Sequence, residues 1–209
     1  MSDRWKSEFE NVWARGVSAW KAGRKSARTM FAPADVAFLA GIGCTAQEMF
    51  DYVDDSLCYD DLDFETVLAV AAIRREYFLS VMHGKATGHI VLMQDLPAKA
   101  AKVDGIAWLP RLLTKARIKL RGELNSDLMY GCVGDRSFLR RHNMTSPQFL
   151  QIVRDKGDDD RAIIDAVKKA AAHRLRRKPA NSGGEPLFSV PMSSSPETDA
   201  TATRALIEH

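Results

Sequence analysis

Apolar residues recur every three or four positions through the first 27 residues of the chain, which is the spacing of one face of a helix. We therefore expect an amphipathic helix over residues 3–27. The apolar stripe of this helix is rich in tryptophan and consists of Trp5, Phe9, Trp13, Val17 and Trp20. Such a stripe is typical of a buried seam, so the helix either closes the core or joins two copies of the chain in a homodimer.

Two short stretches, GCTAQEMF from residue 43 and NMTSPQFL from residue 143, repeat one pattern of polar and apolar positions. In each stretch a threonine is followed three positions later by Glu48 or Gln148, which is the spacing of a capping box. Apolar residues on either side of the box complete a hydrophobic staple. Each stretch therefore predicts a helix that begins directly after Thr45 or Thr145.

The similarity between these two regions extends beyond the caps at a constant offset of 100 residues. Around the caps, the residues that are identical at this offset include Asp35, Phe38, Leu39, Thr45, Val53 and Asp55, which match positions 135, 138, 139, 145, 153 and 155. In both regions the capped helix is followed by a longer one, over residues 63–83 and 159–177. The pattern indicates two related helix-turn-helix-like units, at about residues 30–83 and 130–177, although unrelated helices with a common cap would also explain it.

Between the two units, LPRLLTKARIKLR at residues 109–121 predicts a basic helix. Each unit would expose an apolar face that it cannot cover by itself. We therefore predict an all-α fold in which both units pack around this central helix, in a single helical domain over residues 1–178. Residues 179–209 are rich in Ser, Pro, Gly and Thr, and are expected to be a disordered tail.

Two adjacent arginines, Arg74 and Arg75, lie in the middle of the first long helix. An apolar stripe at helical spacing runs beside them, formed by Val70, Ile73, Tyr77 and Val81. One of the two arginines is therefore expected to point into the protein. Because a buried arginine usually pairs with a carboxylate, we expect an acidic partner for it.

Composition limits the classes of partner and the cellular locations that are expected for the protein. The net charge is only +3, so the overall charge does not indicate nucleic-acid binding, and the basic segment 168–178 contains no aromatic residues for stacking on bases. No apolar run approaches the roughly 20 residues that span a bilayer. The N-terminus has no apolar core of a secretory signal. Three cysteines without a CxxC spacing indicate reduced thiols and a cytoplasmic location.

Three motifs in order, IAWLPRLLTKARIKLRGEL, MYGCVGDRSFL and DDDRAIIDAV, resemble a family of bacterial proteins known as domain of unknown function 5069. GIGCTAQEMFDYVDD and AAIRREYFLSV look like the N-terminal part of its longer members, so the resemblance covers roughly residues 30–170. The resemblance implies a bacterial cytoplasmic protein. It implies no activity and no catalytic residue.

Reactive side chains are concentrated in the second unit, around YGCVGDR at residues 130–136. The first unit has apolar residues at the corresponding positions: Met30, Ala32, Val36 and Ile42 stand opposite Tyr130, Cys132, Arg136 and His142. Polar types gained in only one of two related units indicate a site there. The candidate catalytic residues are therefore Tyr130, Cys132, Asp135, Arg136 and His142.

Four of these residues also have a structural interpretation, which for Tyr130 is a hydroxyl group that caps a loop. Cys132 at the start of a helix is either an activated thiol or a small buried residue. Asp135 has Asp35 opposite it and can be a helix cap. His142 is either a general base or a surface histidine in a turn.

Cations on the central helix are the candidate substrate-binding groups. Arg111, Lys115 and Lys119 share one face, and Arg and Lys side chains bind carboxylates and phosphates. We assign Trp108, Arg111 and Lys115 to substrate binding. Alternatively, the basic face is solvated and neutralised by the acidic clusters at residues 60–61 and 158–160.

These patterns favour a cofactor-independent enzyme or binding protein that acts on a small anionic organic compound. The alternative is a helical interaction module without chemistry, whose basic face docks an acidic partner. The histidines and cysteines lack the spacing of a metal site, and the chain contains no phosphate-binding glycine loop, so no metal and no cofactor are expected. Nucleic acid and membrane partners are not favoured.

Overall fold

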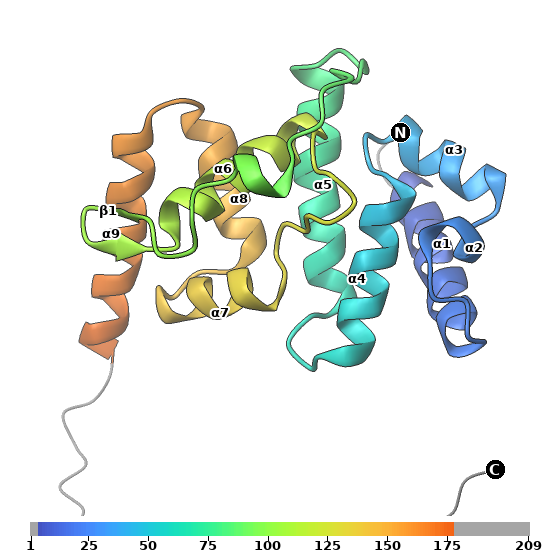
Figure 1. Cartoon of the computed structure of the whole chain (residues 1–209), viewed down its shortest axis with the longest axis horizontal. Helices are drawn as coiled ribbons and strands as arrows, with labels where there is room; N and C mark the ends of the chain where they lie inside the picture. Colours follow the sequence, from blue (N-terminus) through green and yellow to red (C-terminus); the bar gives the residue numbers. More distant parts are fainter. Residues whose placement is uncertain (1–3, 178–209) are drawn as a thin grey trace, which may run out of the picture. The chain divides into compact units, whose positions relative to one another are not determined.

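Helices form most of the regular structure in this computed structural model, which describes residues 4–177 and the side chains of residues 4–173 (Figure 1). In chain order they are α1 (Arg4–Lys21), α2 (Ala27–Met30), α3 (Pro33–Gly41), α4 (Ala46–Cys58), α5 (Phe64–Ser80), α6 (Leu109–Arg121), α7 (Val133–Arg141), α8 (Ser146–Lys156) and α9 (Asp160–Arg177). A 3-10 turn, η1 (Met93–Asp95), and a hairpin of β1 (Lys102–Val103) and β2 (Ile106–Ala107) lie between α5 and α6. The all-α class is confirmed, and the predicted tail, residues 179–209, lies outside the described residues.

The two capped helices begin as the sequence predicts. The Thr45 hydroxyl accepts the Glu48 N–H at 3.1 Å, and the Glu48 carboxylate accepts the Thr45 N–H at 2.9 Å. Thr145 and Gln148 form the same pair of bonds at 3.4 and 2.9 Å. Both boxes therefore satisfy backbone N–H groups that a helix start leaves without a partner.

The backbone around these caps has the same local geometry at the offset of 100 residues. The bounds of α3 and α7 are 100 positions apart, as are the first residues of α4 and α8. The cap threonines have φ/ψ of −112/158° and −109/164°. Two positions before each threonine, Gly43 and Asn143 both have positive φ, of 77° and 57°. The local geometry thus coincides, while a common origin of the two units stays a prediction.

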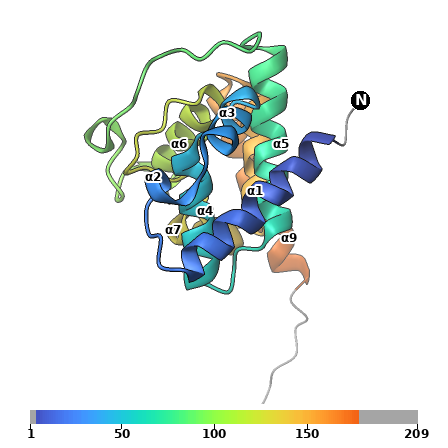
Figure 2. The same ribbon diagram turned by 90° about the vertical axis from the view of Figure 1, so that its right-hand side faces the viewer.

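Helices α5, α6 and α8 pack against one another at the centre of the core, and α9 packs on α8 (Figure 1). On the other side α1 runs across α4, as Figure 2 shows. Phe9 and Trp13 of α1 stack near Phe64 at the start of α5, with a Trp13–Phe64 centroid distance of 5.6 Å. The tryptophan-rich helix therefore closes the core, and it ends at Lys21 rather than at residue 27. None of the helices within residues 4–177 is long and apolar enough to cross a membrane.

Two lysines of the central helix α6 are buried ion-pair partners. The Lys119 ammonium is 2.6 Å from the Glu48 carboxylate, and the Lys119 residue is 1% exposed. One turn earlier, Lys115 binds the carboxylate of Asp135, which is also buried. Burial alone would lower the pKa of Lys119, but the charge and hydrogen bond of Glu48, together with contributions from Tyr52 and Cys44, outweigh burial and raise the pKa. Lys119 therefore remains a cation inside the fold.

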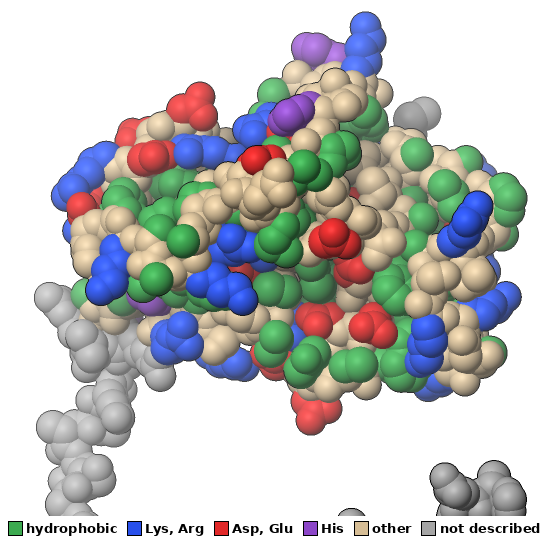
Figure 3. Space-filling view, in the orientation of Figure 1, with side chains coloured by type: hydrophobic (Ala, Val, Ile, Leu, Met, Phe, Trp, Pro, Cys, Tyr) green, Lys and Arg blue, Asp and Glu red, His purple; other side chains and the backbone are tan. Residues whose placement is uncertain are grey.

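The predicted solvated basic face of α6 is therefore largely internal. Arg117, another cation of α6, pairs as expected with the acidic cluster at residues 158–160, through Asp160 at 2.5 Å. Lysine and arginine side chains lie scattered over the face seen in Figure 3 and form no continuous basic patch there.

Arg74 points inward as expected, but its environment differs from the prediction. Arg74 is 2% exposed, and within residues 4–173 it forms no ion pair with a carboxylate. Its guanidinium donates to the Met82 sulfur at 3.3 Å and lies 5.0 Å from the Phe78 ring centroid, while its Nε has no partner. Burial lowers its pKa, although the charge of Glu48 acts in the opposite direction. The prediction that Arg74 pairs with a carboxylate is therefore wrong. Glu48, whose charge acts on Arg74, is already bound by Lys119.

Separating the Lys119–Glu48 pair is expected to destabilise the fold strongly. Glu48→Gln keeps a side chain that can cap Thr45, as Gln148 does in α8, but leaves the Lys119 ammonium buried without a carboxylate. We expect the free energy of unfolding, measured by urea denaturation, to fall by about 3–5 kcal/mol. The double variant Glu48→Gln/Lys119→Met removes the buried charge and is expected to recover most of this loss. Equal losses in the single and double variants would show that the unpaired charge is not the cause.

Asp51 is expected to make stability depend on pH. Burial raises its pKa from the ordinary 3.8 to about 7, against the opposing effect of the hydrogen bond from Gln47. A folded-state pKa above the unfolded one means that stability is lost as pH rises from about 4 to about 7 and stays reduced above that range. Asp51→Asn should therefore raise the free energy of unfolding at pH 8 by about 2 kcal/mol and leave it nearly unchanged at pH 4. Urea denaturation at both pH values tests this, and a variant that tracks the parent protein at pH 8 contradicts it.

Candidate functional site

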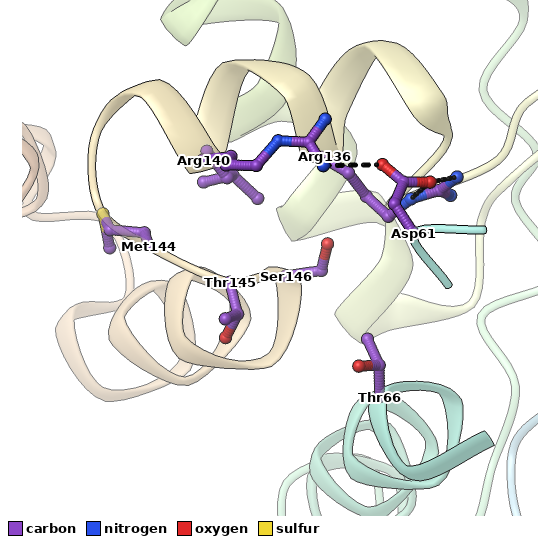
Figure 4. A pocket seen from close by; sticks show the side chains of 8 residues that line it. Asp61, Thr66, Arg136, Arg140, Met144, Thr145 and Ser146 are labelled. Atoms are coloured by element: carbon purple, nitrogen blue, oxygen red, sulfur yellow. Dashed lines mark hydrogen bonds and ion pairs between the residues drawn. The ribbon is translucent and has the colours of Figure 1, made fainter. Parts of the chain in front are cut away.

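A cavity of about 150 Å³ lies beside the turn between α7 and α8 (Figure 4). It is lined by Asp61, Thr66, Arg136, Leu139, Arg140, Met144, Thr145 and Ser146. The two arginines come from α7, the hydroxyl groups come mainly from the start of α8, and the first unit contributes Asp61 and Thr66. The cavity therefore joins residues that are far apart in the sequence, and it combines cations, hydroxyl groups and a short apolar wall.

Arginine and aspartate form an ion-pair cluster on one side of the cavity. Arg136 donates from Nε and Nη2 to one oxygen of Asp61, at 3.0 and 2.6 Å, and from Nη1 to Asp55 and to the Gly131 carbonyl. Arg140 reaches the other Asp61 oxygen at 3.1 Å. The Arg136 hydrogen bond lowers the pKa of Asp61, so this carboxylate stays ionised between the two guanidinium groups. Asp61 thus shows where and how this arginine pair holds a carboxylate.

Ser146 contributes a buried hydroxyl group to the cavity. It is the first residue of α8, it is 4% exposed, and its Oγ has no hydrogen-bond partner among the described residues. Figure 4 shows its side chain pointing from the start of α8 toward the side of α7 that carries Arg136 and Arg140. A buried hydroxyl without a partner costs about 1–3 kcal/mol, so this group is available to a ligand that enters the cavity.

The first unit lacks these polar groups at the corresponding positions. Val36, Ala40 and Ala46 stand opposite the three cavity residues Arg136, Arg140 and Ser146. The shared positions have structural roles: Thr145, like Thr45, caps a helix, and Leu139, like Leu39, is buried in the core. The arginines and the serine of the cavity therefore have no counterpart in the first unit, which contributes Asp61 and Thr66 from other positions.

Four of the residues predicted as site residues come together, but in a cluster separate from the cavity lining. Asp135 accepts the Trp108 indole N–H at 3.0 Å and the Gly131 N–H at 3.0 Å, and binds Lys115. The half-buried Cys132 lies with its sulfur 3.5 Å from the Lys115 ammonium. Asp135 is thus saturated by three donors, which is what a structural anchor requires.

The other predicted residues contact separate groups. Tyr130 is buried, burial raises its pKa well above the usual value, and its hydroxyl donates to the Ser146 carbonyl at 2.8 Å. Arg111 donates to the Pro97 carbonyl at 2.9 Å and to the Met93 sulfur at 2.7 Å. The His142 Nδ1 lies 2.9 Å from the carbonyl oxygen of Phe138, four residues earlier on α7. Of the eight predicted residues, Arg136 is the one that lines the cavity.

Sequence reasoning assigned no site role to five polar cavity residues: Asp61, Thr66, Arg140, Thr145 and Ser146. For two of them a signal was present, because Arg140 and Ser146 face alanines in the first unit, just as Arg136 faces a valine. Asp61 and Thr66 belong to the first unit, and no spacing in the sequence places them beside α7. Among the described residues, no group of three or more His, Cys, Asp or Glu side chains is arranged to hold a metal ion.

Comparison with known proteins places part of the chain in a family. No curated protein and no solved structure matches the chain. Residues 94–181 match the model of the family described as Domain of unknown function (DUF5069). The match includes α6, α7 and α8, and hence the arginines and Ser146 of the cavity, whereas residues 30–83, which the resemblance also covered, lie outside it. The resemblance seen in the sequence is therefore confirmed over this segment.

Proposed function

We propose that the protein binds a small organic anion in the cavity between α7 and α8. The observation that carries the proposal is the Ser146 hydroxyl, buried and without a partner, which lines the same cavity as two arginines. The start of α8 supports it, since the partial positive charge at a helix N-terminus favours an anion. The polar replacements confined to the second unit support it as well.

The dimensions of the cavity indicate the class of anion. A volume of about 150 Å³ equals that of cavities that accept a benzene-sized molecule, so a ligand of about six to eight non-hydrogen atoms fits. Leu139 and Met144 provide an apolar wall for a short carbon skeleton. A guanidinium binds a carboxylate through two parallel hydrogen bonds. The best match is a small organic carboxylate that also carries a group for Ser146.

Asp61 acts in this proposal as an internal competitor for the arginines. Its carboxylate engages both Arg136 and Arg140, and its side chain is 24% exposed, so it is accessible from solvent. With Asp55 also bound to Arg136, the four charges of the cluster sum to zero. A ligand carboxylate therefore gains most where it replaces Asp61 at Arg140, the more exposed of the two arginines.

Binding is favoured over catalysis in this cavity. The residues that line it include no histidine, lysine or cysteine within the described part of the chain, and its Thr145 hydroxyl is engaged in the capping box. Cys132 and Lys115, the reactive pair predicted from the sequence, contact each other in the separate Asp135 cluster.

The proposal also concerns how the two units arose and where in the cell the protein is found. We propose that the two units arose by duplication, which the coincident helix bounds and cap angles support. We also propose a bacterial cytoplasmic location, of which the free cysteines support the cytoplasmic part.

Substitutions in the cavity are expected to weaken anion binding. Ser146→Ala and Arg140→Gln should reduce affinity about 3- to 10-fold and about 10- to 100-fold, because one loses a neutral and the other a charged hydrogen bond. Isothermal titration calorimetry with propionate, lactate, malonate and benzoate tests this. The matched control is Arg141→Gln, which removes the same charge one residue away from a side chain that does not line the cavity. Equal effects of the Arg140 and Arg141 changes, or no binding of any of the four acids, would overturn the proposal.

Asp61→Asn is expected to have the opposite effect. It removes the competing carboxylate and leaves the charges of Arg136 and Arg140 to the ligand, so the affinity for the tightest of the four acids should rise about 10-fold. The same calorimetric titrations measure it, with a parallel denaturation curve to show that the variant is folded. A weaker affinity in a folded Asp61→Asn variant would show that Asp61 contacts the ligand rather than competing with it.

A further inference from the structure

The carboxylates around the anion cavity outnumber its guanidinium groups. An open groove adjoins the cavity and shares Asp61 and Arg140 with it, and this groove is also lined by Asp60. The Asp60 side chain is exposed and forms no hydrogen bond or ion pair within the described residues. Together with Asp55, which pairs with Arg136, three carboxylates therefore face two guanidinium groups. A ligand with only a negative charge adds to this excess, whereas a zwitterion does not.

The two oxygens of Asp61 have different partners, and Figure 4 shows this carboxylate between the two arginine side chains. Its Oδ1 accepts both Nε and Nη2 of Arg136, at 3.0 and 2.6 Å. Its Oδ2 accepts Nη1 of Arg140 at 3.1 Å. A ligand carboxylate that takes over Arg140 therefore leaves Oδ1 bound but removes a partner from Oδ2. A cationic donor on the same ligand restores the lost charged hydrogen bond at Oδ2.

The position of Asp61 Oδ2 determines where on the ligand this donor must lie. The oxygen is 3.1 Å from the Arg140 nitrogen that the ligand carboxylate binds, so the two charged groups of the ligand meet the protein side by side. In an α-amino acid the ammonium is attached to the carbon next to the carboxylate, which gives this arrangement directly. An ammonium farther along the chain reaches the same oxygen only when the ligand folds back on itself, which costs conformational freedom.

We propose that the ligand of the cavity is an α-amino acid with a small apolar side chain, an inference that rests on the proposed function. Its carboxylate binds Arg140 and its ammonium binds Asp61 Oδ2. Its side chain lies against Leu139 and Met144. The Ser146 hydroxyl has no partner, and because a hydroxyl both donates and accepts, it complements either charged group. Space for about six to eight non-hydrogen atoms limits the ligand to the smaller amino acids.

Calorimetric titrations of the full chain with three matched compounds test the proposal. L-Alanine differs from propionate by its ammonium group, and β-alanine carries the same ammonium one carbon farther from the carboxylate. L-Alanine should bind about 10-fold more tightly than propionate, because it adds a charged hydrogen bond. It should also bind about 3-fold or more tightly than β-alanine, whose ammonium is placed less directly. These comparisons use the parent protein and so do not depend on the folding of a variant.

Replacement of Asp61 should remove the preference for the amino acid. Asp61→Asn is expected to reduce the roughly 10-fold preference for L-alanine over propionate to about 2-fold or less. The ratio of the two affinities isolates the ammonium contact, because loss of the competing carboxylate affects both compounds alike. The matched control is Asp60→Asn, which removes the same charge one residue away from an exposed side chain. It should retain a preference of about 5-fold or more, since exposed charges are screened by solvent and salt.

The outcomes separate this inference from the proposed function. Propionate or β-alanine that binds as tightly as L-alanine overturns the α-amino acid as ligand and leaves the proposed anion site intact. A preference for L-alanine that persists in a folded Asp61→Asn variant overturns it too, as does an equal loss of the preference in Asp60→Asn. If neither L-alanine nor any of the tested carboxylates binds, the proposed function fails and this inference fails with it.

Discussion

The fold depends on two buried cations that project from one helix into the two units. Lys115 and Lys119 lie one turn apart on α6, and each binds an acid in the first turn of a helix. The acids are Asp135 of α7 and Glu48 of α4, and each also accepts a backbone N–H at the start of its helix. An ion taken out of water costs several kcal/mol, so each contact is tolerated only when the geometry satisfies both partners. The pairs therefore restrict how α6 can sit between the units more than apolar packing alone would.

This constraint also positions the cavity. Asp135 holds the Gly131 N–H while it binds Lys115, and the Gly131 carbonyl accepts Arg136 Nη1 at 2.7 Å. Tyr130, next to Gly131, donates to the Ser146 carbonyl and so ties the turn to the start of α8. Tyr130 and Asp135, both predicted to perform chemistry, thus also order the turn that carries Arg136 and leads to Ser146. That they take part in chemistry stays a prediction.

Sequence reasoning succeeded where the determining interactions are local. The capping boxes, the helix order and the all-α class follow from residues within a few positions of one another, such as Thr45 and Glu48. It failed for pairings that the tertiary fold decides. Lys119 and Glu48 are 71 positions apart, and no periodicity distinguishes a lysine that reaches such a partner from one that faces water. The same holds for Arg74, whose nearest carboxylate is already bound, and for Asp61, which approaches α7 only because the units pack together.

The equivalent acids of the two units show how a shared scaffold leaves room for binding in one of them. In the second unit, Asp135 binds Lys115 of α6; in the first, Asp35 binds Arg15 of α1 at 2.6 Å. Each unit therefore uses the aspartate at this shared position to attach a neighbouring helix, and that position is not available for a ligand. Three nearby positions differ between the units and do not share this helix-attaching role. In the first unit they are the apolar Val36, Ala40 and Ala46, whereas in the second they are arginines and a serine around a cavity. The first unit forms the same helices without these residues, so helix formation alone does not account for them. Part of their role is to pair with Asp55 and Asp61 of the first unit, and the unpartnered Ser146 hydroxyl is the remaining physical reason to test this cavity for a ligand.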